Sequence, residues 1–322
     1  MIRIRFAVLL SLFAVPVGGA SPSAISEPPA WAYPVPPPDV KSLPDDGATR
    51  TVPDSNASYT TAQLNDLFLA PDWHPLVHPK MPEVVAHGRK PDVFACGHCH
   101  RSEGSGGPEN ASLAGLPYAY IVQQMSDYKS GKRSTALPNR LPQAWMMKLA
   151  KEVTDEEVRE AARYFSSLNP KQNIRVVETN QVPKTYVANW FLATQEGTQT
   201  ELLGERIVET PENLEQFENR DSRATFIAYV PAGGVSKGAA IVGGDKVGRA
   251  LACATCHGQN LQGHAAVPSI AGRSPSYIVR QLFDIQNGVR AGKGAASMRA
   301  PAARLSLDDM ISVAAYLASL KP

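Results

Sequence analysis

Every cysteine of this chain of 322 residues lies in one of two copies of a Cys-x-x-Cys-His motif. The copies consist of Cys96, Cys99 and His100 in the first half of the chain, and of Cys253, Cys256 and His257 in the second. On a helical turn, residues three and four positions apart share one face, so both sulfurs and the imidazole can meet one ligand. This spacing is the attachment signature of c-type haem, in which the cysteines form thioethers and the histidine binds iron. The sequence therefore predicts two covalently bound haem c groups, and two such groups indicate electron transfer.

Other chemistries of paired cysteines fit this pattern less well. A zinc site would need two Cys-x-x-Cys pairs close together, whereas these pairs lie 157 residues apart. A thioredoxin-like redox pair would be surrounded by a βαβ pattern, which is not visible here. A disulfide framework gives no reason for a histidine directly after both pairs. Because haem would use every cysteine, we expect no disulfide bonds.

The motifs belong to a longer internal repeat. At an offset of 157 residues, the stretch 96–133 aligns with 253–290 without a gap, and 14 of its 38 positions are identical. Such a duplication indicates two copies of one small fold. Middle helices are expected over residues 120–128 and 277–286, each followed by a glycine. After a long loop, capping-box signatures that begin at Thr154 and Ser306 predict a terminal helix in each copy.

These features together resemble class I cytochromes c. The resemblance rests on both motifs, on the Pro-x-Ile-Ala-Gly stretch at 268–272 with its counterpart at 111–115, on the two Tyr-Ile-Val-x-Gln helices and on the closing helices. The tandem arrangement is most similar to dihaem cytochromes of the c-four type, which are soluble periplasmic electron carriers. The resemblance implies cytochrome c domains at residues 83–170 and 236–322.

The resemblance implies a methionine as the second iron ligand in each domain. Met298 lies eight residues before Ser306, and the residue eight before Thr154 is Met146. We expect these two methionines to complete the iron coordination of His257 and His100, with the neighbouring Met147 as the alternative in the first domain. The other methionines lie in the leader, before the first motif or at core positions: Met1, Met81, Met125 and Met310.

Further residues acquire expected roles from the same resemblance. The carbonyl of Pro268 is expected to orient His257, and Ala111 occupies the matching position of the first domain. Arg133 and Arg290 are expected near the haem propionates or, equally, as solvated charges at helix ends. His98, inside the first motif, is expected at the surface. Single histidines that could replace a methionine ligand are more simply surface or core residues: His74, His78, His87 and His264.

The N-terminus indicates export. A basic start with Arg3 and Arg5, an apolar run over residues 6–17 and small residues at 18–20 predict a signal peptide at residues 1–20. No later stretch is apolar enough to span a membrane, so we expect a periplasmic protein. Removal of the signal peptide leaves 30 basic and 30 acidic residues, a balance that argues against a nucleic-acid partner. Residues 237–321 hold 10 basic against 4 acidic residues, which is either ordinary surface or a basic face for an acidic redox partner.

Two segments are not explained by the resemblance. Residues 21–82 are rich in proline and predict an extended N-terminal arm across the haem domains, with a disordered tether as the alternative. Residues 171–235 contain short β-rich runs at 174–177, 186–192, 206–208 and 224–230. We expect a small β-rich module there, which either spaces the haem domains or binds a partner. The expected fold is therefore mainly α, with two class I cytochrome c domains, this module between them and the arm in front.

These observations favour a periplasmic dihaem c-type cytochrome that transfers single electrons between redox partners and is not itself an enzyme. The expected partners are periplasmic or membrane-bound redox proteins, such as a dehydrogenase or a terminal oxidase. The alternative is a haem-carrying electron-transfer subunit of a larger periplasmic dehydrogenase or oxidase complex, because a simple carrier needs neither arm nor module. A dihaem peroxidase or a sulfur-compound oxidoreductase would need an open iron position or an unusual ligand. A methionine stands at the expected place in each domain instead.

Overall fold

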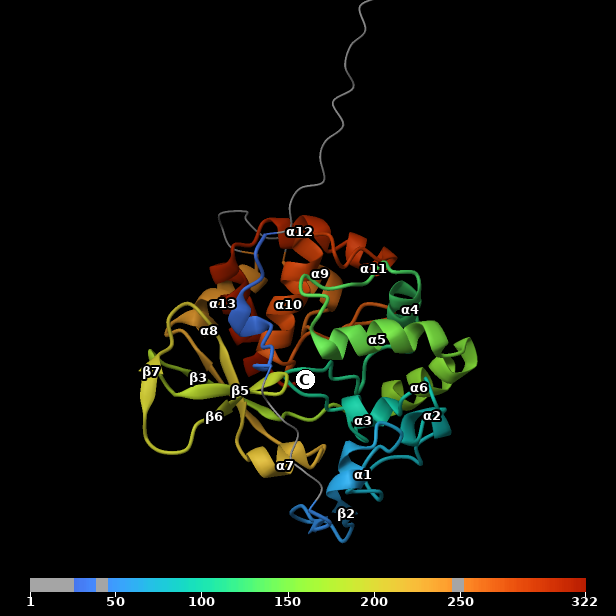
Figure 1. Ribbon diagram of the computed structural model, residues 1–322. Helices are drawn as coiled ribbons and strands as arrows, with labels where there is room; N and C mark the ends of the chain where they lie inside the picture. The colour runs from blue at the N-terminus through green and yellow to red at the C-terminus, as the bar shows by residue number, and fades with distance from the viewer. Residues whose placement is uncertain (1–25, 39–45, 245–251) are drawn as a thin grey trace, which may run out of the picture.

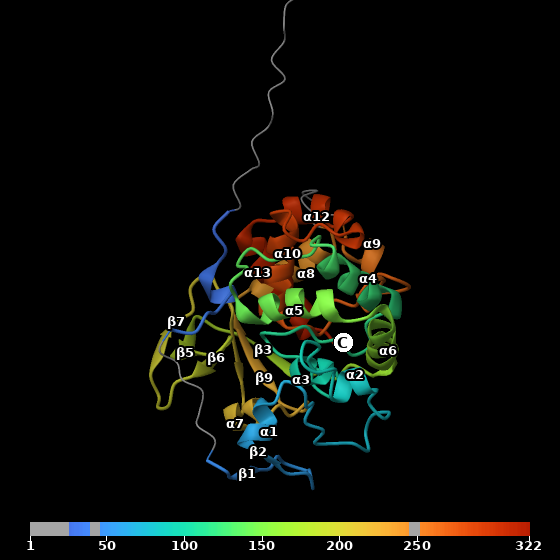
Figure 2. The same cartoon turned by 45° about the vertical axis from the view of Figure 1, so that its right-hand side comes forward.

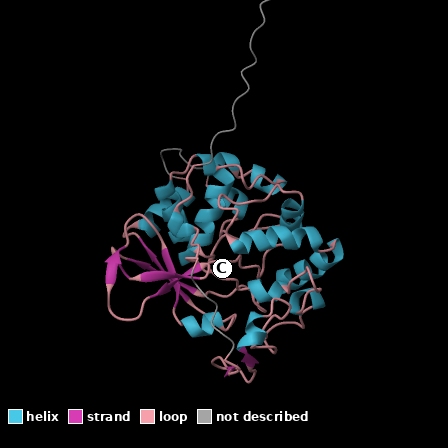
Figure 3. Cartoon of the chain, viewed as in Figure 1, coloured by secondary structure: helices cyan, strands magenta, loops and turns pink. Residues whose placement is uncertain are grey.

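The two halves of the repeat form two groups of helices, and most of the strands gather on one side of them, apart from the β1–β2 pair (Figures 1 and 3). The computed structural model describes residues 26–38, 46–244 and 252–322. The signal peptide expected at residues 1–20 lies outside the described residues. Among the residues that are described, no helix is both long enough and apolar enough to cross a membrane.

Five helices make up the first repeat and six the second, as far as the described residues go. The first repeat contains α2 (Glu83–Ala86), α3 (Cys96–His100), α4 (Tyr118–Lys129), α5 (Leu141–Glu152) and α6 (Asp155–Ser167). The second repeat contains α8 (Gly234–Val242), α9 (Ala254–His257), α10 (Pro275–Gln286), α11 (Lys293–Ala296), α12 (Arg299–Ala303) and α13 (Leu307–Ser319). Helix α5 lies between α10 of the second repeat and α3 of the first (Figures 1 and 2).

Local sequence signals determine where the main helices begin and end. The expected capping boxes are confirmed at Thr154 and Ser306, where each hydroxyl accepts a backbone N–H three residues on. The middle helices are confirmed as α4 and α10, and the glycines after them, Gly131 and Gly288, have φ values of 71° and 73°. A positive φ ends a helix at little cost only in glycine. These signals therefore reproduce the same helical frame in both repeats.

The long loop expected before the terminal helix is wrong in both repeats, because α5 occupies it in the first and α11 and α12 occupy much of it in the second. Pro142 lies in the first turn of α5, where the fixed φ of proline favours a helix start instead of breaking one. Good helix formers follow, including Met146 and Met147. The candidate ligand Met146 is consequently carried by a helix, whereas Met298 precedes α12 as its N-cap.

Residues 174–230 contain a three-stranded sheet and two strand pairs. The strands are β3 (Ile174–Glu178), β4 (Gln181–Pro183), β5 (Thr185–Ala188), β6 (Phe191–Thr194), β7 (Thr200–Leu202), β8 (Val208–Pro211) and β9 (Phe226–Val230), with helix α7 (Leu214–Glu218) before the last. In the sheet, β9 runs parallel to β3 and antiparallel to β8. The single run expected at 186–192 is wrong: Asn189, at φ 55°, reverses the chain and makes a β5–β6 hairpin.

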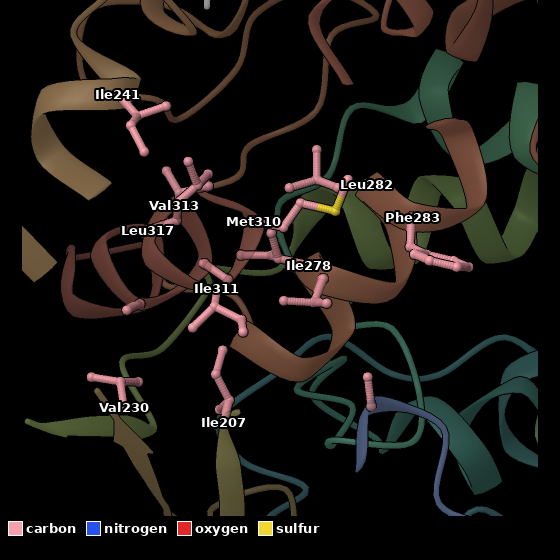
Figure 4. Close-up of a cluster of buried hydrophobic side chains, with 14 of the residues drawn as sticks. Ile207, Val230, Ile241, Ile278, Leu282, Phe283, Met310, Ile311, Val313 and Leu317 are labelled. Atoms are coloured by element: carbon pink, nitrogen blue, oxygen red, sulfur yellow. The ribbon is translucent and has the colours of Figure 1, made fainter. Parts of the chain in front are cut away.

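The core of the second repeat extends into these strands. Ile207 and Val230 belong to the same buried cluster as Ile278 of α10 and Ile311 of α13. Figure 4 shows these side chains pointing toward one another from the three parts of the chain. Met310, expected in the core, is fully buried in this cluster. One edge of the strand segment therefore joins the core of the second repeat, while most of its other buried side chains form clusters of their own.

The described part of the N-terminal segment lies against both repeats. Its elements are the 3-10 helix η1 (Ala30–Ala32), strands β1 (Thr49–Arg50) and β2 (Tyr59–Thr60) and helix α1 (Thr61–Asn65). The hydroxyl of Tyr33 donates to Asp284 of α10 at 2.8 Å, and Arg140, the N-cap of α5, donates to the carbonyl of Pro34 at 3.1 Å. Residues 30–34 thus contact the start of α5 and the face of α10.

Candidate haem sites

The first motif forms the short helix α3, which brings its three candidate residues to the wall of one cavity. Cys96, Cys99 and His100 line a space of about 700 Å³ that opens to solvent. The remaining wall is mainly apolar and includes Phe94, Leu113, Ile121, Trp145, Leu149 and Phe165. A flat, apolar ring attached through two sulfurs fits a cavity with this lining. The geometry therefore suits the haem that the motif predicts.

His100 has the hydrogen bond and the protonation state that an iron ligand needs. Its Nδ1–H donates to the carbonyl of Ala111 at 2.8 Å, as the resemblance implied. This bond fixes the ring and leaves Nε2 as the coordinating nitrogen. Burial, assisted by the cation of Arg133, lowers the pKa of His100 to about 4. The imidazole is therefore neutral at pH 7 and has a lone pair available for a metal.

The second motif repeats this arrangement. His257, at the end of α9, donates from Nδ1 to the carbonyl of Pro268 at 2.8 Å, which confirms the expected acceptor. Burial lowers its pKa as well. Cys253 and Met298 pack against the same buried cluster of the second repeat. The two hydrogen bonds from Nδ1 to a carbonyl have the same length and lie 157 residues apart in the sequence, so the duplication preserves the orientation of the histidine.

The structure distinguishes the two neighbouring methionines of α5. Met146 lines the cavity together with His100. Met147 is not part of the lining, and its sulfur accepts the hydroxyl of Ser134 at 3.8 Å. Met125, expected in the core, packs against the core of the first repeat and also reaches the cavity wall. This arrangement favours Met146 over Met147 as the second ligand in the first site.

We predict that Met146→Ala exposes the first iron, whereas Met147→Ala leaves both haem spectra unchanged. The reason is that only Met146 lies on the cavity wall that also carries His100. Binding of carbon monoxide to the reduced holoprotein measures the difference, since a free coordination position is required. Ligand binding in the Met147 variant alone would reverse the assignment, and Met125→Ala tests the third sulfur near the cavity.

Arg133 and Arg290 join the two repeats, which neither sequence interpretation anticipated. They are 7% and 8% exposed, so they are not solvated charges at helix ends. Arg133 donates to the hydroxyl of Tyr277 at 3.0 Å, and Arg290 to that of Tyr120 at 2.8 Å. Each guanidinium also donates to Gln124, at 2.9 Å in both cases. The contacts are related by the offset of the repeat, so the two domains meet through equivalent faces.

These two arginines have no carboxylate partner within the described parts of the chain. No ion pair involves either guanidinium among those residues, and Nε of Arg290 is buried without a hydrogen-bond partner. A buried cation without a counter-charge is costly. Haem propionates are anions that would supply this charge. At this interface the propionates would therefore supply the counter-charge for both arginines and an acceptor for Nε of Arg290.

The expectation for His98 is wrong, because this side chain is buried, with 1% of its surface exposed. Its Nδ1 hydrogen-bonds the carbonyl of Leu69 at 3.0 Å, and its own carbonyl accepts from Arg220 at 3.2 Å. At the adjacent Gly97, a Cβ would lie 2.8 Å from the Cβ of Ala70. The N-terminal segment and the loop after α7 therefore cover the outer side of the first motif.

The other histidines considered as ligands have other partners or positions. His74 pairs with Asp221 at 3.0 Å in a buried contact, and His78 contacts Asp72 and the hydroxyl of Tyr164. His87 is the C-cap of α2 and His264 lies in a turn closed by Val267. None of the four lines the first cavity.

Comparison with known proteins places both repeats in one family. The cytochrome c family model matches residues 88–169 and 236–321. Cytochrome c4 of Pseudomonas aeruginosa is 25% identical to this chain over 230 residues. The aligned region covers 70% of this chain and 83% of that protein. Cytochrome c-554(548) of Halomonas halodenitrificans is 37% identical over 83 residues, 26% of this chain and 96% of that protein. A thiosulfate dehydrogenase electron acceptor of Thiomonas intermedia is 24% identical over 232 residues, 71% of this chain and 80% of that protein.

Proposed function

Since this chain belongs to the cytochrome c family, we propose that Cys96, Cys99 and His100 hold one haem and Cys253, Cys256 and His257 the other. The chain is a dihaem, cytochrome c4-like electron-transfer protein with covalently bound haem c. We further propose that its domains extend over residues 83–170 and 236–322, with Met146 and Met298 as the second iron ligands. When bound, each haem supplies a one-electron couple between ferric and ferrous iron.

The observation that carries this ligand assignment is that His100 and Met146 line one cavity while Nδ1 of His100 is already bonded. The thioethers fix the position of the ring, and the carbonyl of Ala111 fixes the orientation of the imidazole. The methionine sulfur favours ferrous iron, which raises the potential. The apolar wall would shield the bound ring from water on the sides that it covers, which would lower the reorganisation that accompanies each electron. These residues suit electron transfer more than chemistry on a substrate, because His100 and Met146 would hold the iron from both sides and leave no position for a substrate.

For the partner, we propose a periplasmic dehydrogenase that oxidises a sulfur compound. Support comes from two relatives named thiosulfate dehydrogenase electron acceptor, one of them 41% identical over 73 residues. In the second motif Thr255 and Cys256 are exposed, so a partner can approach the second haem through this surface. The alternative, a permanent subunit of such a dehydrogenase, draws on the additional strands, one edge of which joins the core of the second repeat.

Stopped-flow reduction of the purified holoprotein by a thiosulfate dehydrogenase tests this proposal. We expect two electrons per chain to be accepted, at a rate that falls with ionic strength if a charged face guides the encounter. A freely diffusing carrier gives rates proportional to its concentration, whereas a permanent subunit co-purifies with the enzyme. No reduction by this class of enzyme, in either form, would contradict the proposed partner.

A further inference from the structure

The two motifs differ at the residue that directly follows the histidine, which is Arg101 in the first repeat and Gly258 in the second. Both residues have the same backbone conformation, with φ 69° and ψ 158° for Arg101, and φ 81° and ψ 161° for Gly258. This region of φ/ψ space is open almost only to glycine, so the arginine is held there against backbone strain. Strain of this kind persists only where the surrounding structure enforces it.

Helix α7 and the loop that follows it provide that enforcement, because Phe217 belongs to the helix and Arg220 to the loop. The guanidinium of Arg101 lies over the ring of Phe217 at 4.8 Å and donates to the carbonyl of Phe217 at 3.4 Å. The side chain is 2% exposed, and its Nε and Nη1 are buried without hydrogen-bond partners. A second cation, Arg220, donates to the carbonyls of Leu64 and His98 at 2.8 and 3.2 Å. Two arginines are therefore fixed on the outer side of the first motif.

These cations remain charged, and carboxylates offset part of their charge. Burial lowers the pKa of Arg220 to about 10, which still leaves it protonated at neutral pH. The carboxylate of Glu109 lies 3.8 Å from Arg101. The buried carboxylate of Asp221, which hydrogen-bonds His74 at 3.0 Å, also acts on Arg101. In the second repeat, Gly258 stands at the position of Arg101 and Ala266 at the position of Glu109, and neither carries a charge.

The first motif, which has the nearby arginines, is also the less exposed of the two. His98 is buried, whereas its repeat counterpart Thr255 is exposed, as is Cys256. A ferric haem carries one more positive charge than a ferrous haem. Nearby cations and a low dielectric both disfavour that extra charge, because they raise its electrostatic energy and withhold its solvation. Charge and burial therefore both favour the ferrous state at the first site.

We propose that Arg101 and Arg220, held by α7 and the loop after it, raise the reduction potential of the first haem above that of the second. At equilibrium a single electron then resides on the first haem, and the exposed second motif is the side on which partners exchange electrons. This inference rests on the haem and ligand assignment of the proposed function. Residues 171–235 would then tune the potential of the first haem, in addition to the two roles considered for them, which are spacing the haem domains and binding a partner.

Redox titration of the holoprotein with Arg101→Gln and Arg101→Lys tests the proposal. Both variants keep a long side chain in the same strained conformation, but only the lysine keeps the charge. We expect Arg101→Gln to shift the electron distribution toward the second haem at least threefold, which is about 28 mV at 59 mV per tenfold change. Arg101→Lys should remain close to the unmodified protein. Arg175→Gln, which removes an exposed cation of β3 paired with Glu212, is the matched control and should shift neither potential.

Met298→Ala assigns the potentials, since it changes the second haem alone under the proposed ligation. The higher of the two potentials should persist in this variant. Its loss would place the higher potential on the second haem and overturn the inference, as would equal shifts for Arg101→Gln and Arg175→Gln. Failure of the proposed function looks different: fewer than two haems, or spectra that respond to neither Met298→Ala nor Met146→Ala.

Discussion

Replacing both cysteines of the first motif, by Cys96→Ser with Cys99→Ser, should reduce the haem content from two groups per chain to one. Without thioethers the ring is held only by its iron ligands and by packing. Loss of the ring leaves the apolar cavity of about 700 Å³ next to the core of the first repeat. We expect the free energy of unfolding to fall by more than about 4 kcal/mol, at the upper end of single-site effects. Haem staining of the denatured chain and thermal unfolding measure the two results.

The corresponding change in the second motif, Cys253→Ser with Cys256→Ser, is the internal control for this prediction. It should remove the other haem and leave the spectrum of the first unchanged. Two haems that remain bound after denaturation of either double variant would show that the motifs are not the attachment sites. Loss of both haems from a single double variant would show that the domains do not load independently.

Met298→Ala should open the second iron to added ligands and lower the potential of that haem. A thioether ligand favours ferrous iron, and its loss removes that preference. We expect a tenfold or larger change in the reduction equilibrium, which equals at least about 59 mV for one electron. Spectroelectrochemistry and binding of cyanide to the ferric protein measure the change.

Met310→Ala is the matched control in the same domain. This methionine is buried in the core on α13 and has no expected contact with iron. Its truncation should lower stability by about 2–5 kcal/mol, as for other core methionines, and leave the haem spectra unchanged. If cyanide binds to the Met310 variant and not to the Met298 variant, the ligand assignment in the second domain is wrong.

The residues that carry the haem chemistry could be predicted because their signals are local. The motif spacing, the capping boxes at Thr154 and Ser306 and the glycines after α4 and α10 each depend on a few adjacent residues. The acceptor of His257 followed from the resemblance to class I cytochromes c. The repeat carried it over to Ala111 for His100, because a backbone carbonyl serves from alanine as well as from proline. Such features depend little on the rest of the fold, so the structure reproduces them.

The features that the sequence did not predict depend on distant contacts. His98 is buried because Leu69 and Arg220 cover it, and these residues lie 29 and 122 positions away. The pairing of Arg133 with Tyr277 spans 144 positions. Helix α5 was missed because its proline was not recognised as a helix start. The sequence did contain one signal that the surroundings of the two motifs differ. An arginine follows His100, whereas a glycine follows His257 at the matched position.

Each chain should hold two low-spin haems, each between a histidine and a methionine. Near-infrared magnetic circular dichroism of the ferric holoprotein, quantified against the haem content of the same sample, measures this ligation. We expect a sulfur-to-iron charge-transfer signal with the intensity of two haems and no high-spin contribution. A signal with the intensity of one haem, a pattern of two nitrogen ligands or a high-spin component would contradict it.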